Sequence, residues 1–269
     1  MAHNRCVDLL RIRRATLPID DDSLTLDAES ARLADPAIAD ITLSVGPASF
    51  RGYPSFSKDP RMKLYFHPMS GNSRRALLVA AHLGIPLERI VVDLTKGEQR
   101  GAPHLARNPN GRVPVLDDDG VLLWESRAIM QYLADKTAGQ TLLPADARGR
   151  AEVNRWLFWC AAHMTPANAM LVRERVVKPL LGQEPDPALV AQGEELFRQA
   201  APILDAQVAR QTWVVHDSLT LADFSLAAGF ALAGPARLPI ADYGHLRAWL
   251  GRVQELDAWQ RTAPPQGPR

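Results

Sequence analysis

Two segments, Asn108–Leu116 and Trp124–Ile129, contain the residue types that could hold a small charged ligand. In the first, Val113-Pro114 stands where a loop enters an apolar stretch. Proline cannot donate to a β-ladder, so we expect a cis peptide bond at this point. Such a turn would leave the amide and carbonyl of Val113 unpaired by the sheet. An extended peptide could then dock on Val113 like an added strand.

Glu125 and Ser126 lie at the predicted start of a helix in the second segment. The amide and hydroxyl of Ser126 would face outward at the positive end of the helix dipole, which favours a carboxylate ligand. Glu125 could bind an ammonium group beside it. A peptide-like ligand with both an α-amino and an α-carboxylate group would satisfy the whole set.

Residues 62–139 alternate between strand and helix patterns and must position these groups. In chain order, the expected elements are a strand at Lys63–Phe66, a helix at Ser73–Leu83, a strand at Arg89–Leu94, hairpin strands at Val113–Leu116 and Val121–Trp124, and a helix at Ser126–Lys136. A βαβ unit implies parallel strands, and the hairpin adds an antiparallel pair, so the sheet should be mixed with helices on both faces. This order resembles an α+β thioredoxin-like domain (βαβ-ββα).

Strand patterns nearly vanish after Pro144, and residues 147–262 are expected to form an all-α bundle. A linker is placed at about 138–146. The helical stretches are Ala147–Val172, Asp186–Arg210, Thr220–Ala233 and Tyr243–Glu255. Thr220-Leu-Ala-Asp223 matches a capping box, in which the threonine accepts from the third helical amide and the aspartate reaches back.

Residues 1–61 carry no sustained hydrophobic period, and they include the run Asp20-Asp21-Asp22. We expect this extension to be mostly disordered. An alternative interpretation is that Met62 is the true start and that the preceding residues are a translation artefact.

Composition excludes several classes of function. The 269 residues are 46% hydrophobic and 23% charged with a net charge of +1, so neither nucleic acid nor a membrane surface is favoured as partner. The two cysteines, Cys6 and Cys160, lie far apart, which argues against a disulfide framework and a zinc site, and no metal is expected. No apolar stretch is long enough to span a membrane and no secretory signal is recognisable, so a cytoplasmic protein is expected.

The segment from Met62 to Lys136 resembles the N-terminal domain of cytosolic glutathione transferases, nearest to the phi/theta-like branch of bacteria and plants. Val113-Pro114, Glu125-Ser126 and the later capping box occur in the order found in that family. The resemblance implies that glutathione is the co-substrate, with its γ-glutamyl end at the Glu-Ser pair. It also implies a homodimer and a helical domain that shapes a pocket for a hydrophobic electrophile.

The resemblance also assigns a catalytic hydroxyl. Ser70-Gly-Asn-Ser-Arg74 is similar to the S-x-x-x-R pattern of the serine-type classes, in which the serine donates a hydrogen bond to the glutathione sulfur. The reactive species is the thiolate, and an ordinary thiol titrates near ~8.5. Asn72 and Ser73 could donate to the same sulfur, and Ser73 could instead only cap its helix. A site without any side-chain donor is a further alternative.

The predicted contacts to the glycine end of glutathione depart from the family pattern. Phi-like relatives carry a His-Lys pair where this chain has Gln99 and Arg100. Gln99 can still form hydrogen bonds, and Arg100 can still pair with a carboxylate. Arg112 is a second candidate for that carboxylate. Both arginines could equally be solvated surface charges.

The electrophile pocket is expected on the first helix of the second domain, where Trp156, Trp159, His163 and Met164 lie at helical spacings. Such a stripe could equally be ordinary core or a subunit interface. The favoured function is conjugation of the glutathione thiolate to hydrophobic electrophiles, with glutathione peroxidase activity as an addition. The alternative is a non-catalytic binding or protein-association module with the same fold.

Overall fold

The computed structural model describes residues 62–263, and the predictions for residues 1–61 lie outside this range. The first half of the described chain contains a sheet and its flanking helices. Its elements are β1 (Met62–Phe66), α2 (Gly71–Leu83), β2 (Glu88–Val91), η3 (Glu98–Arg100), α3 (Ala102–Leu105), β3 (Val115–Asp118), β4 (Val121–Trp124) and α4 (Ser126–Asp135). The predicted order of the four strands and of helices α2 and α4 is confirmed.

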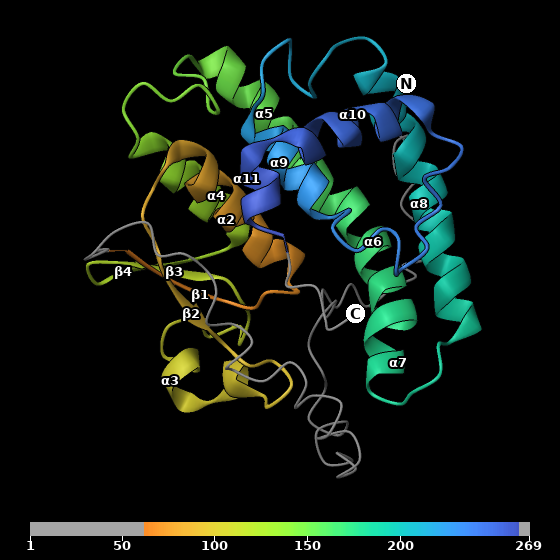
Figure 1. The fold of residues 1–269 in the computed structure, drawn as a ribbon, viewed down its shortest axis with the longest axis horizontal. Coiled ribbons are helices and arrows are strands. Elements are labelled where there is room, and N and C mark those ends of the chain that lie inside the picture. Colours follow the sequence, from red (N-terminus) through yellow and green to blue (C-terminus); the bar gives the residue numbers. More distant parts are fainter. Residues whose placement is uncertain (1–61, 264–269) are drawn as a thin grey trace, which may run out of the picture.

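The four strands form one mixed sheet in the order β2-β1-β3-β4. β1 runs parallel to β2 and antiparallel to β3, and β3 pairs with β4 in the predicted hairpin. Helices α2 and α4 lie together on one side of the strands, whereas α3 lies on the other side (Figure 1). The thioredoxin-like arrangement follows because a right-handed βαβ crossover places α2 on one face.

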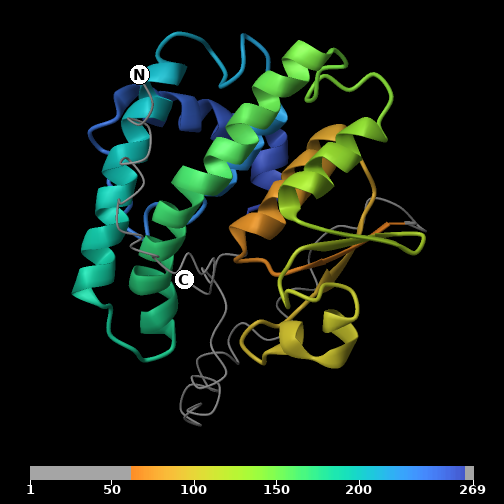
Figure 2. The ribbon, with the colours of Figure 1, turned by 180° about the vertical axis from the view of Figure 1, so that it is seen from behind.

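The second half of the described chain is helical. Its elements are α5 (Ala147–Trp159), η4 (Cys160–Met164), α6 (Thr165–Val172), η5 (Arg173–Val177), α7 (Lys178–Leu180), α8 (Pro187–Val208), α9 (Leu221–Ala228), α10 (Gly244–Glu255) and α11 (Asp257–Arg261). Figure 2 shows α5 and α6 in line as one long rod, with α8 beside it. None of the helices in residues 62–263 is both long and apolar enough to cross a bilayer.

Three details of the helical half differ from the sequence expectation. The first helix continues from Ala147 to Leu180, because the π-helical turns η4 and η5 join α5, α6 and α7 without a break. A pattern based on 3.6 residues per turn does not detect such turns. Helix α9 ends at Ala228 rather than Ala233, and Gly229 follows it as the C-cap. The short helix α11 was not predicted.

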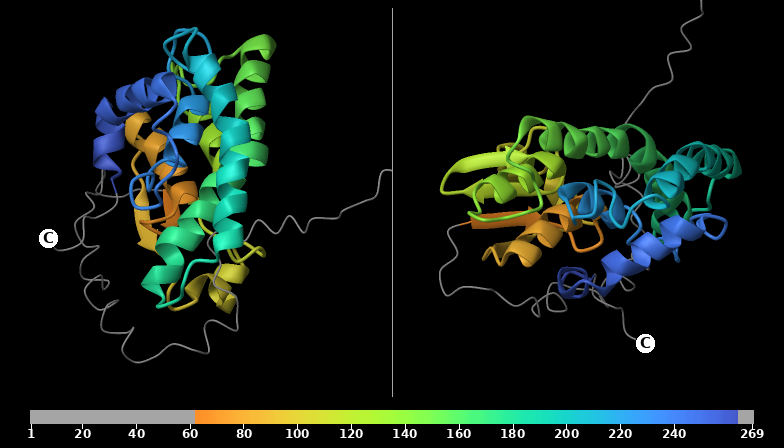
Figure 3. Two further views of the ribbon diagram at one scale, coloured as in Figure 1. Left: turned by 90° about the vertical axis from the view of Figure 1, so that its right-hand side faces the viewer. Right: turned by 90° about the horizontal axis from the view of Figure 1, so that it is seen from above.

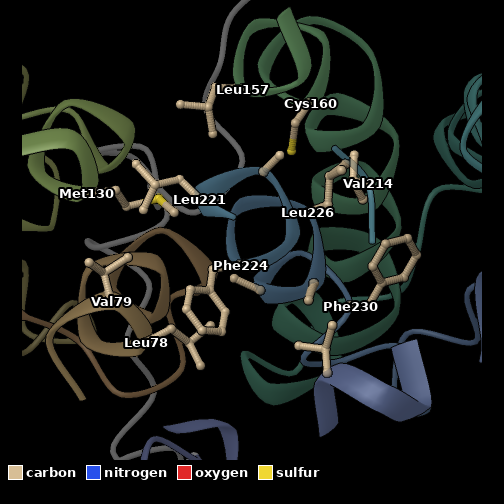
Figure 4. Close-up of a cluster of buried hydrophobic side chains, with 14 of the residues drawn as sticks. Leu78, Val79, Met130, Leu157, Cys160, Val214, Leu221, Phe224, Leu226 and Phe230 are labelled. Atoms are coloured by element: carbon tan, nitrogen blue, oxygen red, sulfur yellow. The ribbon is translucent and has the colours of Figure 1, made fainter. Parts of the chain in front are cut away.

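Helix α9 is the central element of the molecule. All of its residues, Leu221–Ala228, are buried, and it packs against α2 on one side and α5 on the other. Seen from above, α9 lies between the sheet domain and the outer helices (Figure 3). Figure 4 shows Phe224 of α9 directed toward Leu78 and Val79 of α2, with Leu157 and Cys160 on the opposite side. One continuous core therefore joins the two halves.

The predicted capping box at the start of α9 is present. Asp223 is fully buried and accepts hydrogen bonds from the amides of Thr220 and Val214, both at 2.9 Å, and from the Trp249 indole at 2.9 Å. The carboxylate thereby connects α9 to the preceding loop and to α10.

Candidate active site

The strand register brings three loop segments to one edge of the sheet. Tyr65, next to the end of β1, is paired with Val115, and Val115 is paired with Trp124 at the end of β4. The segment after β1, the turn before β3 and the start of α4 must therefore emerge at the same edge. These are the segments that carry Ser70, Val113-Pro114 and Glu125-Ser126.

Ser70 is the N-cap of α2. Its Oγ accepts a hydrogen bond from the Ser73 amide at 3.2 Å, and its own amide donates to the His67 carbonyl at 3.0 Å. Ser70 is 2% exposed. Because a hydroxyl can accept and donate at once, the Ser70 hydrogen remains for a further acceptor at the positive end of the helix.

The two rival donors are placed differently. Ser73 is fully buried, and its Oγ accepts from the His67 amide at 3.2 Å, so it fixes the loop after β1. The cap of α2 is Ser70, not Ser73. Asn72 is half-buried, and its Oδ1 accepts a hydrogen bond from the Arg75 guanidinium.

Sequence reasoning carried the family's arginine to Arg74, but the structure turns this side chain away from the sheet edge. Arg74 donates to the Trp259 carbonyl at 3.0 Å, and its guanidinium lies 3.7 Å from the centre of the Trp259 ring. It therefore holds α11 against α2. The loop between β1 and α2, residues 67–70, is called the Ser70 loop below. The neighbouring Arg75, which the sequence did not single out, lines a hollow beside this loop.

The Val113-Pro114 peptide bond is cis, as predicted. The carbonyl just before it, that of Arg112, accepts hydrogen bonds from Asn108 Nδ2 at 2.8 Å and from His104 Nε2 at 2.9 Å. Because a carbonyl only accepts, His104 must carry its hydrogen on Nε2. His104 and Asn108 thus fix the approach to the turn, a role that sequence reasoning did not assign.

Glu125 and Ser126 form the start of α4. Glu125 is its N-cap, exposed and with a φ of 72°, a conformation that side chains other than glycine rarely adopt. Ser126 is 5% exposed and is the first helical residue. Glu125 makes no side-chain cap to the helix, so the amides of the first turn are left for an external anion.

The residues predicted for the glycine end of glutathione lie in two segments, with Gln99 and Arg100 in η3 and Arg112 in the turn before β3. Gln99 is 2% exposed, and its Oε1 has no hydrogen-bond partner among residues 62–263. Arg100 is exposed, and Arg112 is half-buried. Of the three side chains, only Gln99 is held inside the protein with an unsatisfied polar atom, which is unfavourable without a ligand or water.

The hollow beside the Ser70 loop lies between the two halves of the molecule. It is lined by Met69, Gly71, Asn72, Arg75, Thr165, Asn168, Ala169, Val172, Ala228, Gly229, Ala231 and Leu232. The walls thus come from the start of α2, from α6, and from α9 and the turns that follow it. They are mainly apolar, with a few polar side chains.

The four residues predicted to line the electrophile pocket do not contribute to this hollow. Trp156 and Trp159 border a different hollow between α5 and α8, Met164 is 1% exposed and part of the core, and His163 is exposed. The reason is the π-helical turn η4, which inserts an extra residue into the helix and rotates α6 relative to α5. Thr165 and Asn168 reach the hollow instead.

Models of two protein families match this chain. The glutathione S-transferase N-terminal domain matches residues 60–135, and the glutathione S-transferase C-terminal domain matches residues 160–257. Glutathione S-transferase 3 of Zea mays is 37% identical over 207 residues, which cover 75% of this chain and 92% of the maize protein. The chain belongs to the glutathione S-transferase family.

Solved structures support the same assignment for this transferase. The apo structure of glutathione S-transferase III has a TM-score of 0.70 at 35% identity and covers 77% of this chain and 99% of its own. Glutathione S-transferase I from maize, in complex with an atrazine glutathione conjugate, has a TM-score of 0.69 at 28% identity and covers 75% and 96%. Glutathione S-transferase 3 of Zea mays and two further relatives, from Oryza sativa and Arabidopsis thaliana, are plant proteins. The bacterial part of the expected resemblance is therefore not supported.

A polar cluster that the sequence did not reveal connects α4 of the transferase with η4, α6 and α9. Arg127 of α4 donates to Cys160 Sγ at 3.1 Å, Thr165 Oγ1 at 2.8 Å and Ser225 Oγ at 3.1 Å. Burial raises the pKa of the Cys160 thiol, but Arg127 and Arg75 outweigh burial and hold this pKa below its ordinary value. Residues 62–263 contain no group of His, Cys, Asp or Glu side chains that could hold a metal ion.

Proposed function

We propose that this glutathione S-transferase binds glutathione in an extended form along the Val113-Pro114 turn and transfers its thiolate to a hydrophobic electrophile. The observation that carries the proposal is the strand register, which gathers the Ser70 loop, the cis turn and the start of α4 at one edge. The γ-glutamyl carboxylate would meet the amides at the start of α4, and Glu125 would pair with the ammonium group.

Ser70 is the proposed donor to the sulfur. Its hydroxyl is buried, and it stands at the start of a thirteen-residue helix, where a negative charge is stabilised. One charge-assisted hydrogen bond and the helix dipole together would supply roughly 2–3 kcal/mol, which lowers the thiol pKa by up to about two units. Ser70 itself stays protonated and forms no covalent bond.

Gln99, Arg100 and Arg112 are proposed to bind the glycine end of glutathione. Gln99 has the strongest support, because its buried Oε1 has no donor among residues 62–263 and can accept a hydrogen bond from the amide N–H of the glycine residue of glutathione. Arg100 and Arg112 carry the positive charge that a terminal carboxylate needs.

The electrophile is proposed to enter the hollow between Met69 of the Ser70 loop, Val172 of α6 and Leu232 after α9. This assignment replaces the predicted stripe at Trp156, Trp159, His163 and Met164. The maize enzyme solved with an atrazine glutathione conjugate shows that a relative accommodates both parts of such a product. Reduction of peroxides by glutathione in the same site is a further proposed activity.

A homodimer is proposed because large apolar side chains remain exposed on several elements of the described chain, with three of them together on β4. Val121, Leu122 and Trp124 of β4 are 55%, 41% and 39% exposed, and Phe158 of α5 is 69% exposed. Large exposed apolar groups of this kind mark association surfaces. Light scattering of the purified protein should give twice the chain mass, and Phe158→Asp should shift the population toward monomer.

A phi-like class and a cytoplasmic location are proposed on the basis of the plant relatives and the cytosolic family that the chain resembles.

The function is tested by retention on glutathione resin together with turnover of 1-chloro-2,4-dinitrobenzene. We expect elution by free glutathione and formation of the aryl conjugate. Retention without turnover of any aryl halide, alkyl halide or peroxide would indicate a binding module instead. Absence of retention and of turnover would contradict the proposal altogether.

A further inference from the structure

We propose that Arg75 orients the carboxamide of Asn72 so that its Nδ2 group faces the electrophile and stabilises the negative charge that develops there during the reaction. The favoured substrates would be electrophiles whose reacting carbon is conjugated to a nitro or carbonyl group. The inference rests on the proposed function. In this arrangement Ser70 donates a hydrogen bond to the sulfur, and Asn72 donates one to the electrophile.

Arg75 is held in one position by elements from both halves of the molecule. It is 2% exposed, its Nε donates to the Ser225 carbonyl of α9 at 2.9 Å, and its Nη2 donates to Thr165 Oγ1 of α6 at 3.3 Å. A guanidinium group is planar and rigid, so fixing Nε and Nη2 also fixes the direction of Nη1. Nη1 is the atom that donates to Asn72.

The chemistry of the two groups decides which way the Asn72 carboxamide points. A guanidinium group only donates hydrogen bonds, so the atom that meets it must be Oδ1 rather than Nδ2. Nδ2 then points away from Arg75, and within residues 62–263 it donates to no acceptor. Asn72 is half-buried and lines the hollow beside the Ser70 loop. A polar amide with both hydrogens available is therefore presented to the electrophile.

The position of this amide relative to the hollow is well defined. Gly71 precedes Asn72 at a close approach of α2 to α9, where an added Cβ would lie 3.1 Å from the Ala228 carbonyl oxygen. This close packing fixes the start of α2. The rest of the hollow is lined mainly by apolar groups such as Val172 and Leu232, which suit the body of an aromatic or alkyl electrophile.

The charge balance of the reaction explains the expected selectivity. When the thiolate attacks a nitroaryl halide, its electron pair forms the carbon–sulfur bond and negative charge moves onto the nitro oxygens, until the halide leaves with an electron pair. Addition to an α,β-unsaturated carbonyl places the charge on the carbonyl oxygen before the α-carbon takes a proton from water. Direct displacement at an alkyl halide develops charge only on the halide and has no such oxygen for Asn72.

The test compares Asn72→Ala with the wild-type protein on two electrophiles, 1-chloro-2,4-dinitrobenzene and benzyl bromide. We expect the ratio of kcat/KM for the nitroaryl substrate to kcat/KM for benzyl bromide to fall about tenfold, as for loss of one hydrogen bond to a charged group. Arg75→Lys should lower the same ratio by a smaller factor, because a lysine cannot hold the carboxamide in one orientation. Circular dichroism verifies that Arg75→Lys folds, and Asn72→Ala tests the idea independently of it.

The pH dependence of kcat/KM distinguishes a hydrogen bond from Asn72 to the electrophile from one to the sulfur. If Asn72 serves the electrophile, the apparent pKa of the bound thiol stays within about 0.3 units of wild type, which is less than 0.5 kcal/mol. A raised thiol pKa, or an equal loss on both substrates, would overturn the inference while leaving the proposed function intact. Absence of wild-type turnover on either substrate would instead contradict the proposed function itself.

Discussion

The starts of helices α2 and α9 use the same chemistry for opposite purposes. At α9, the carboxylate of Asp223 accepts hydrogen bonds from Thr220, Val214 and Trp249, and all of these donors belong to the protein. At α2, Ser70 accepts one bond from Ser73 and keeps its hydroxyl hydrogen for a further acceptor. One helix start is closed within the fold, whereas the other is proposed to be completed by a ligand.

The difference lies in what covers each helix start. Helix α9 is buried along its whole length between α2 and α5, so its capping groups must satisfy one another. The start of α2 lies at the sheet edge, where β1 ends and a hollow opens toward α6. A capping residue can therefore act as a site residue where the fold leaves one of its hydrogen-bonding groups without a partner in the protein, as at Ser70.

The largest expected effect tests the closed helix start. Asp223→Ala removes the acceptor for four buried donors, the amides of Val214 and Thr220, the Thr220 hydroxyl and the Trp249 indole, so the free energy of unfolding should fall by about 3 kcal/mol or more. Urea titration followed by circular dichroism measures the loss. The exposed Asp217→Ala variant, in the loop before α9, should change stability by less than about 0.5 kcal/mol. A similar loss in both variants would show that the buried hydrogen bonds of Asp223 contribute no more to the free energy of unfolding than an exposed carboxylate does.

Substitution at the open helix start should affect chemistry more than folding. Ser70→Ala should lower turnover by about 10- to 1000-fold, because one donor to the sulfur anion is lost. The pKa of the bound thiol should also rise, so that a higher pH is needed to form the thiolate. Asp186→Ala, which removes the N-cap of α8, is the matched control: each variant should lose about 1 kcal/mol of stability. Only Ser70→Ala should lose activity. If Asn72→Ala were damaging on every electrophile and Ser70→Ala silent, the assignment to Ser70 would be wrong.

The start of α4 should behave as a binding site without a part in the chemical step. Ser126→Ala and Glu125→Gln should each weaken glutathione binding by about tenfold, the equivalent of one charge-assisted contact. Calorimetric titration with glutathione measures the dissociation constant. Ser70→Ala should leave that constant within about twofold of wild type, which separates binding from activation of the thiol. Unchanged affinity in both α4 variants would place the ligand elsewhere.

The smallest expected effect concerns the loop that supports Ser70. Burial lowers the pKa of His67 below its ordinary value of 6.5, and the charge of Asp93 offsets this only in part. The unfolded chain therefore takes up the proton first as the pH falls. The contribution of His67 to the free energy of unfolding is then fully present above pH 6.5 and is lost as the pH falls below it.

Urea titrations at pH 7.5 and 5.5 test this effect. His67→Gln should show a smaller decrease in stability between the two pH values than the wild-type protein. An identical decrease in both proteins would assign the pH dependence to other groups, such as His82, whose pKa burial also lowers.

Much of the fold could be predicted from the sequence, because its signals are local. The β-branched and apolar strands, the hairpin turn before Val121 and the left-handed Gly84 after α2 each depend on neighbouring residues. The same holds for the cis bond at Val113-Pro114 and for the capping box at Thr220. Each feature is specified within a few positions of the chain.

The composition of the site was decided by tertiary structure. The sequence offers Arg74 and Arg75 side by side, and only the packing of α11 and α9 sends one to Trp259 and the other to the hollow. The other walls of the hollow come from residues between Thr165 and Leu232, far from Met69 in the chain, and the π-helical turn after Trp159 affects which side chains of α6 reach it. Local patterns fix elements, but the rotation and contact of distant helices determine which side chains meet.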